Sequence, residues 1–294
     1  MATAYPPSSA LEATSAERYQ GLRMFMANKA ALFGAVLMAI ILFVSYILPA
    51  IFTDDKFAYA GKRHLAPFSE NGPFFGTDYL GRGVGLIVMH GGSTTLEVAG
   101  FAALLIVTVG AVVGALAGFY GGIVDRALMK VTEFFQVLPG LLFALVVVAL
   151  FGASTITIVL AIGIISWPPV ARQTRSEFLR QKNLEYVKAA RSIGASNARI
   201  ILRTILPNTL PVLIVQATLT MGAAILFEAG LAFLGLGDPE SLSWGYYVGL
   251  NRQYFLVNWW GVTFPGFMVF ITVLSLSLIG DGIQDAINPK LRGR

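Results

Sequence analysis

Few residues of this chain are of types that could make or break covalent bonds. It has no Cys and only two His, His64 and His90, which excludes a thiolate nucleophile or a disulfide framework and argues against an all-His zinc site. The Gly-Lys pair at 61–62 lacks the upstream glycine of a phosphate-binding loop. The Gly-Gly-Ser segment at 91–93 lacks the second glycine of a nucleophile elbow. We therefore expect no catalysis, no metal or cofactor, and no ATP bound by this chain itself.

Three glutamates stand out because they lie in or beside strongly apolar segments. A charge at the centre of a bilayer costs about 2.5–3.5 kcal/mol on insertion scales, so each needs a role. Glu97 and Glu133 fall close to the ends of their segments, where an interfacial position explains them. Glu228 lies about 18 residues into its segment, which is about 27 Å at a rise of about 1.5 Å per residue. We predict that Glu228 lies near the outer mouth, where it either lines a pathway or makes a structural hydrogen bond.

Composition places the chain in a membrane. Of its 294 residues, 56% are hydrophobic and 13% are charged, and the mean hydropathy is +0.71, whereas soluble domains are about half apolar and about a quarter charged. Helices of about 20 apolar residues cross the hydrocarbon core. The run at 153–170 is shorter, and we accept it as a span because without it the basic segment at 172–203 and the basic C-terminal tail would lie on opposite sides of the membrane. We predict an all-α polytopic membrane protein with six transmembrane helices, near 30–52, 96–119, 131–151, 153–170, 209–234 and 262–280.

The basic residues are distributed unevenly between the two sides of these spans. With an inner N-terminus, 16 of the 21 Lys and Arg residues fall in inner segments, as the positive-inside rule requires. This predicts cytoplasmic N- and C-termini in a bacterial plasma (inner) membrane. The first apolar run exceeds the roughly 7–15 residues of a signal-peptide core, so we expect an uncleaved anchor.

The spans divide the chain into five parts. The first residues, with Pro6-Pro7-Ser8-Ser9 and no apolar periodicity, are typical of a disordered tail. The long, Gly-rich outer loop is expected to form a small structured cap. The parts are a disordered cytoplasmic tail at 1–29, an N-terminal transmembrane helix at 30–52, an extracytoplasmic loop at 53–92, a membrane-spanning core at 93–285 and a cytoplasmic tail at 286–294.

A basic segment at 172–208 separates two of the spans and contains a helix–turn–helix pattern at 184–200. Gly194 stands where the end of a helix needs positive φ, and Ser196 is placed to cap the next helix. Such a helix can lie in a groove of a partner protein as an amphipathic anchor. Its apolar residues recur every three positions and form one stripe; they are Leu184, Val187, Ala190 and Ile193.

This segment resembles the loop by which permease subunits of binding-protein-dependent ABC importers dock on their ATPases. Ala189, Ala190, Gly194, Leu206 and Pro207 fall where that motif places them. The rest of the chain resembles the dipeptide, oligopeptide and nickel branch, and within it the second of two paired permeases. The further motifs follow the order of that branch; they lie at 76–82, 120–126, 138–140, 166–168, 228–237 and 280–282.

The resemblance implies a five-span permease core at 93–285, preceded by one extra span, that moves a solute by alternating access. It implies four partners besides membrane lipid: a homologous second permease, two cytoplasmic ATPase subunits that bind ATP and Mg, and an extracytoplasmic solute-binding protein. Short peptides are the commonest cargo of the branch, with nickel, opines, glutathione and oligosaccharides left open. The implied ATPase-docking residues are Glu185, Tyr186, Lys188, Ala189, Ala190, Ile193, Gly194, Ala195 and Ser196.

The sequence departs from the docking motif at one position. Lys188 stands where the motif carries its glutamate. Either Glu185, about one turn earlier, supplies the missing acid, or the charges on the ATPase differ. The departure bears on the ion pair and not on docking itself.

Three glycines at spacing four, Gly110, Gly114 and Gly118, form a row that lets another helix approach closely. The row serves either packing within the subunit or the seam with the second permease. The sequence alone leaves both open.

Other functions explain fewer of these features. A DNA-binding helix–turn–helix has the shape and charge of 184–200, but close membrane spans would bar it from the major groove, so no nucleic-acid partner is expected. A loop serving topology alone, an intramembrane enzyme and a scaffold without transport are further alternatives. A stand-alone proton- or cation-coupled secondary transporter would need acids near the midplane and no partner-docking loop.

Overall fold

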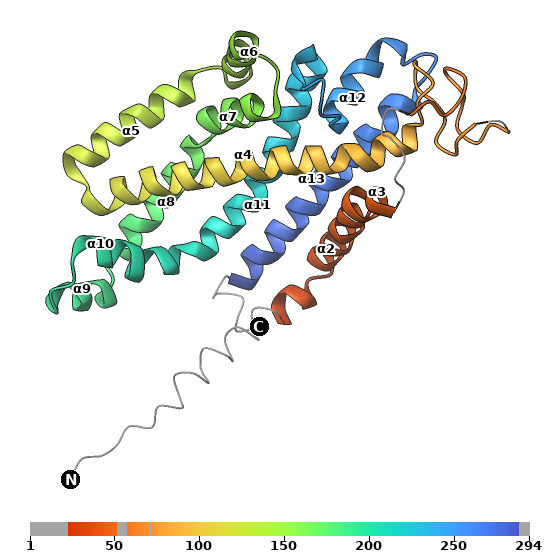
Figure 1. Cartoon of the computed structure of the whole chain (residues 1–294). Coiled ribbons are helices and arrows are strands. Elements are labelled where there is room, and N and C mark those ends of the chain that lie inside the picture. Colours follow the sequence, from red (N-terminus) through yellow and green to blue (C-terminus); the bar gives the residue numbers. More distant parts are fainter. Residues whose placement is uncertain (1–22, 52–57, 71, 288–294) are drawn as a thin grey trace.

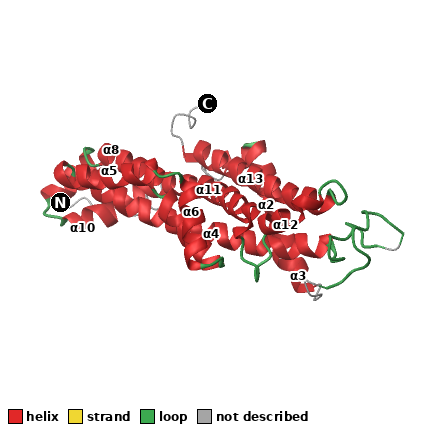
Figure 2. Cartoon of the chain, turned by 90° about the horizontal axis from the view of Figure 1, so that it is seen from above, coloured by secondary structure: helices red, strands yellow, loops and turns green. Residues whose placement is uncertain are grey.

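The protein is built from helices, as predicted. The computed structural model describes residues 23–51, 58–70 and 72–287, and Figure 1 shows the described part as long helices packed side by side, with a loop-rich cap at one end. Figure 2, coloured by secondary structure, shows the same helices from above. In this part of the chain, β-structure consists of two isolated bridges, Tyr59 to Arg82 and Thr77 to Gly83.

Within the described residues, four helical stretches are long and apolar enough to cross a membrane. The first runs over Lys29–Ile51 and comprises α2 (Lys29–Leu42), a π-helical segment (Phe43–Ile47) and α3 (Leu48–Ile51). The second is α4 (Val84–Tyr120). The third, Asn197–Leu236, contains α10 (Asn197–Arg199), a π-helical segment (Ile200–Ile205), α11 (Leu206–Leu231) and a second π-helical segment (Ala232–Leu236). The fourth is α13 (Trp260–Ile287).

Two bent helix pairs raise the number of spans to as many as six. Helices α5 (Gly122–Val137) and α6 (Gly140–Phe151) meet at 82°, and α7 (Thr155–Ser166) and α8 (Pro168–Gln181) meet at 46°. Proline disfavours the helical conformation of the residue before it, and Leu138 before Pro139 is indeed extended. The predicted span 131–151 is therefore not one continuous helix.

Helix α4 begins at Val84, well before the predicted start at residue 96. The stretch 84–95 contains several glycine, serine and threonine residues, which hide its helical character. Gly91 and Gly92 there lie directly against Trp244, the first residue of α12 (Trp244–Asn251). Glu97 therefore lies 13 residues after the start of a 37-residue helix. The residues after it still suffice to cross about 30 Å of hydrocarbon, so its interfacial position stays a prediction.

The N-terminal boundary of the first span also differs from the prediction. Residues 23–27 are helical, and the Asn28 side chain caps α2 by accepting hydrogen bonds from the amides of Ala30 and Ala31. The Asn28 amide also donates to Asp285 Oδ2 at 3.0 Å. The prediction of a disordered tail is therefore wrong for residues 23–29, which form a short helix, the Asn28 cap and the start of α2. The predicted tails at 1–22 and 288–294 lie outside the described residues.

The loop-rich cap, which lies between α3 and α4, is held together by a buried ion pair. Arg82 Nε lies 2.7 Å from Asp78 Oδ2, and the other carboxylate oxygen accepts the backbone N–H groups of Leu80 and Arg82. Trp260 at the start of α13 donates its indole N–H to the Thr77 carbonyl at 2.9 Å. The cap is thus attached to the same helices that cross the membrane.

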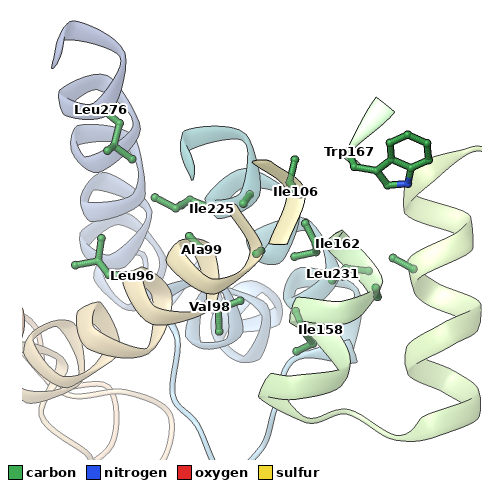
Figure 3. Packing of buried hydrophobic residues seen from close by; sticks show 14 of the residues in the cluster. Leu96, Val98, Ala99, Ile106, Ile158, Ile162, Trp167, Ile225, Leu231 and Leu276 are labelled. Atoms are coloured by element: carbon green, nitrogen blue, oxygen red, sulfur yellow. The ribbon is translucent and has the colours of Figure 1, made fainter. Parts of the chain in front are cut away.

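The main core lies where α4, α7, α11 and α13 meet. Figure 3 shows Ala99 and Ile106 of α4 facing Ile225 of α11 and Ile162 of α7. Small residues of α4 are fully buried there, so neighbouring helices approach its backbone closely. Helix α4 is therefore the central element of the fold.

The glycine row of α4 packs against α8 of the same subunit. A Cβ atom added at Gly110 would lie 2.6 Å from Val170 Cβ, and one added at Gly118 would lie 2.7 Å from the Arg175 carbonyl oxygen. At Gly114 it would clash with the Ala171 carbonyl oxygen. The structure thus selects packing within the subunit.

We predict that Gly114→Ala destabilises the protein by about 1–3 kcal/mol, the usual effect of overpacking, because the clash is with backbone and cannot be relieved by a rotamer change. Gly100→Ala in the same helix is the matched control, since a Cβ there meets nothing within 4 Å. Thermal unfolding of the purified protein checks both variants. Equal stabilities of the two variants would contradict the close α4–α8 contact.

Candidate functional site

The helix–turn–helix expected at 184–200 is present. Helix α9 (Glu185–Ser192) ends in a turn at Gly194, whose φ is +80°, and the amide of Ala195 donates to the Ala190 carbonyl at 3.1 Å. This six-residue closure is the Schellman arrangement that favours glycine. Ser196 Oγ then accepts the Arg199 amide at 3.3 Å and caps the next helix. The local geometry predicted for Gly194 and Ser196 is confirmed.

The apolar stripe of α9 is divided between the protein's own core and its surface. Val187 is 1% exposed and packs in a small cluster with Phe119 of α4, Phe178 of α8 and Ile200. Ile193 at the other end of the helix is 86% exposed. Because Val187 is buried in the chain's own core, the stripe as a whole cannot lie in a partner's groove. The periodicity of the sequence shows which residues are on one helix face, but not whether that face packs within the chain.

The nine predicted docking residues lie together on this segment, and most of them are exposed. Ala190 and Ala195 are half-buried beside the Val187 cluster. Glu185 stands in the first turn of α9, where the helix dipole favours an acid. The exposed members are Glu185, Tyr186, Lys188, Ala189, Ile193, Gly194 and Ser196.

One buried amide connects α9 to two other helices. Gln181 at the end of α8 is 1% exposed, and its Oε1 accepts the Tyr186 hydroxyl at 2.8 Å. Its Nε2 donates to Glu177 Oε1 at 2.9 Å and lies 3.3 Å from Thr209 Oγ1 of α11. Burial raises the pKa of the Tyr186 hydroxyl, so it remains a donor at neutral pH. Sequence reasoning missed Gln181, because no local pattern marks a junction of three helices.

Two further polar contacts join the membrane helices near this segment. Lys182 Nζ donates to the carbonyls of Gly118 and Phe119 at 3.1 and 3.3 Å, at the end of α4 where a cation is favourable. Arg175 of α8 forms a bidentate pair with Asp125 of α5 at 2.5 and 2.6 Å. Helices α4, α5, α8 and α9 are therefore tied together at the end of the molecule that carries α9.

A cavity of about 490 Å³ opens between α4, α5, α6, α7, α8 and α11. Its wall is mainly apolar and carries a few hydrogen-bonding groups, the usual make-up of a small-molecule site. The polar residues that line it are Gln136, Ser166, Gln216 and Thr220.

Glu228 is buried beside this cavity and does not line it; its neighbour Phe227 does. Glu228 is 2% exposed, and Ser243 Oγ donates to its Oε1 at 2.5 Å. Ser243 also caps α12 by accepting the Tyr246 amide at 3.0 Å. Of the two roles left open for Glu228, this geometry favours the structural hydrogen bond between α11 and α12.

We predict that Glu228→Ala and Ser243→Ala are coupled in a double-mutant cycle of thermal stability. Removing either partner leaves the other buried group unpaired, which lowers the free energy of unfolding by about 1–3 kcal/mol. The loss in the double variant should therefore be smaller than the sum of the two single losses by about 0.5–3 kcal/mol. Strict additivity would contradict the contact and return Glu228 to the pathway interpretation.

Comparison with known proteins agrees with this arrangement. The family model described as "Binding-protein-dependent transport system inner membrane component" matches residues 110–293. The dipeptide transport system permease protein of Alkalihalophilus pseudofirmus is 33% identical over 290 residues, covering 98% of this chain and 94% of the relative. The di/tripeptide transport system permease protein of Pseudomonas aeruginosa is 36% identical over 274 residues, covering 91% and 90%.

A glutathione transport system permease protein of Escherichia coli is 36% identical over 276 residues, covering 92% of this chain and 88% of the relative. Among solved structures, inward-facing conformations of the MetNI methionine ABC transporter match with a TM-score of 0.58 and 20% identity, covering 69% of this chain and 96% of that chain. The structural match supports the fold alone.

Proposed function

This chain belongs to the family of binding-protein-dependent transport system inner membrane components, and we propose that it passes short peptides into the cytoplasm. It is a permease subunit of an ABC importer and a multi-pass protein of the inner membrane. Family membership disfavours the stand-alone transporter. The peptide cargo is supported by the relatives, which are described as permeases for dipeptides, di/tripeptides, oligopeptides and glutathione.

The proposed partners are a homologous permease, two ATPase subunits and an extracytoplasmic solute-binding protein. The chain carries no phosphate-binding loop of its own, so ATP and Mg would be bound by the ATPases. Figure 1 shows α9 and α10 at the opposite end of α4 from the cap. With the cap outside, the docking segment and both termini face the cytoplasm.

The exposed surface of α9 is the single observation that carries the docking proposal. Ile193 projects from the end of a helix whose other side is packed on α4 and α8 through Val187. A large exposed apolar residue at the tip of a rigid, basic segment suits a partner groove. ATP-driven displacement of the partner would then move α4 and α8 directly.

Chemical crosslinking tests the docking proposal in this naturally Cys-free chain. Single cysteines at the exposed positions Ala189 and Ser196 should crosslink to the co-expressed ATPase subunit with a short bis-maleimide. Tyr59→Cys on the cap, at a position 80% exposed, is the control and should react only with reagents added from outside. Crosslinks of the cap cysteine to the ATPase, with none from α9, would refute both docking and orientation.

A further inference from the structure

A second cavity, of about 430 Å³, lies between α8, α11 and α13. Resting on the proposed peptide transport, we propose that it is a release site that binds the charged termini of a short peptide through Glu177 and Arg180. Its wall is more polar than that of the first cavity. The residues that line it are Gln173, Glu177, Arg180, Asn208, Pro211, Val212, Val215, Gln284 and Ile287.

The two cavities follow the same faces of the same two helices. On α8, Pro169 lines the first cavity, and Gln173, Glu177 and Arg180 line the second. These positions are spaced by three or four residues, so they share one helix face. On α11 the corresponding residues run from Asn208 and Val212 in the second cavity to Leu219, Ala223 and Phe227 in the first. A solute leaving the first cavity along this face therefore reaches the second.

The second cavity lies at the cytoplasmic end of this track. Glu177 in its wall accepts a hydrogen bond from Gln181, which in turn holds Tyr186 of the docking helix. The cavity is thus next to the segment proposed to contact the ATPase. This position suits release and not first capture.

Glu177 and Arg180 present opposite charges one helical turn apart. Arg180 binds the Glu177 carboxylate through two contacts, with Nε donating to Oε2 at 3.0 Å and Nη2 donating to Oε1. The Arg180 side chain is 63% exposed and that of Glu177 16%. A guanidinium has five N–H donors in a fork that fits a carboxylate. The three N–H groups of Arg180 that this pair leaves over can bind a second carboxylate, and the remaining lone pairs of the Glu177 carboxylate can accept from an ammonium group.

A dipeptide carries the two charges that complement this pair. Its ammonium and carboxylate are at most about 7 Å apart, from about 3.3–3.6 Å per residue, so they bind Glu177 and Arg180 together when the contact between these two side chains opens. The amides of Gln173 and Gln284 can donate to and accept from the peptide bond. Blocking both termini would remove the charges while leaving size and shape nearly the same.

Cysteine protection tests the site in the assembled complex, in inside-out vesicles prepared with two different phospholipid compositions. Gln284→Cys should react with a charged methanethiosulfonate reagent, and millimolar alanyl-alanine should slow that reaction severalfold. N-acetyl-alanyl-alanine amide should not slow it. Adding Arg180→Gln should abolish protection by alanyl-alanine. Arg126→Cys, exposed on α5 outside the cavity, is the control and should react at one rate throughout.

Equal slowing by the blocked peptide, or protection that survives Arg180→Gln, would overturn the site. Protection that changes with the phospholipid composition and ignores the dipeptide would assign the cavity to a lipid headgroup and also overturn it. Peptide uptake by the unaltered complex with its binding protein is measured in parallel. If alanyl-alanine does not protect Gln284→Cys while uptake is intact, only the release site is refuted. Absence of peptide uptake refutes the proposed cargo.

Discussion

The close contact between α4 and α8 is the constraint on which the rest of the structure depends. Three glycines one turn apart allow the backbone of α8 to touch α4, and larger residues at Gly110, Gly114 or Gly118 would separate the two helices. The contact brings Phe119 and Phe178 to one small core at the end of the molecule. Val187 of α9 completes that core. The position of α9 is therefore set by a membrane-helix contact.

Polar contacts surround this apolar contact and lie on different helices. Lys182 holds the end of α4, Arg175 holds α5 through Asp125, and Gln181 holds both α9 and α11. Gln181 is buried, so replacing it would leave the polar groups that it contacts unpaired. Together they join α4, α5, α8, α9 and α11 into one mechanical unit at the end of the molecule that carries α9. Motion applied to α9 would be passed to the helices that line both cavities.

Local sequence signals predicted the features that depend on nearby residues. Gly194 placed the turn after α9, and the glycine row predicted a close helix contact. These signals act through backbone conformation or size, which the residue itself determines. Five of the six predicted spans followed from length and apolarity, and the sixth followed from the distribution of basic residues. The described residues contain four helices that can cross a membrane, and up to six spans if each bent pair is one span.

Features that depend on distant residues could not be predicted in this way. The pairing of Asp125 with Arg175 crosses 50 positions, and the start of α4 depends on Trp244 packing against Gly91 and Gly92. The stripe on α9 was visible, but whether Val187 faces its own chain or a partner depends on where α4 and α8 lie. Gln181 carries no motif at all. Such residues become visible only when the helices are in place.

Distance measurement by pulsed electron paramagnetic resonance tests most directly whether α9 and α4 form one unit. Spin labels at Ser192→Cys on α9 and Tyr120→Cys at the end of α4 occupy exposed positions of a chain with no other cysteine. In the assembled complex, the distance distribution should be the same without nucleotide and with a trapped ATP analogue. A shift larger than the width of the distribution would show that α9 moves independently of α4, which would contradict the account.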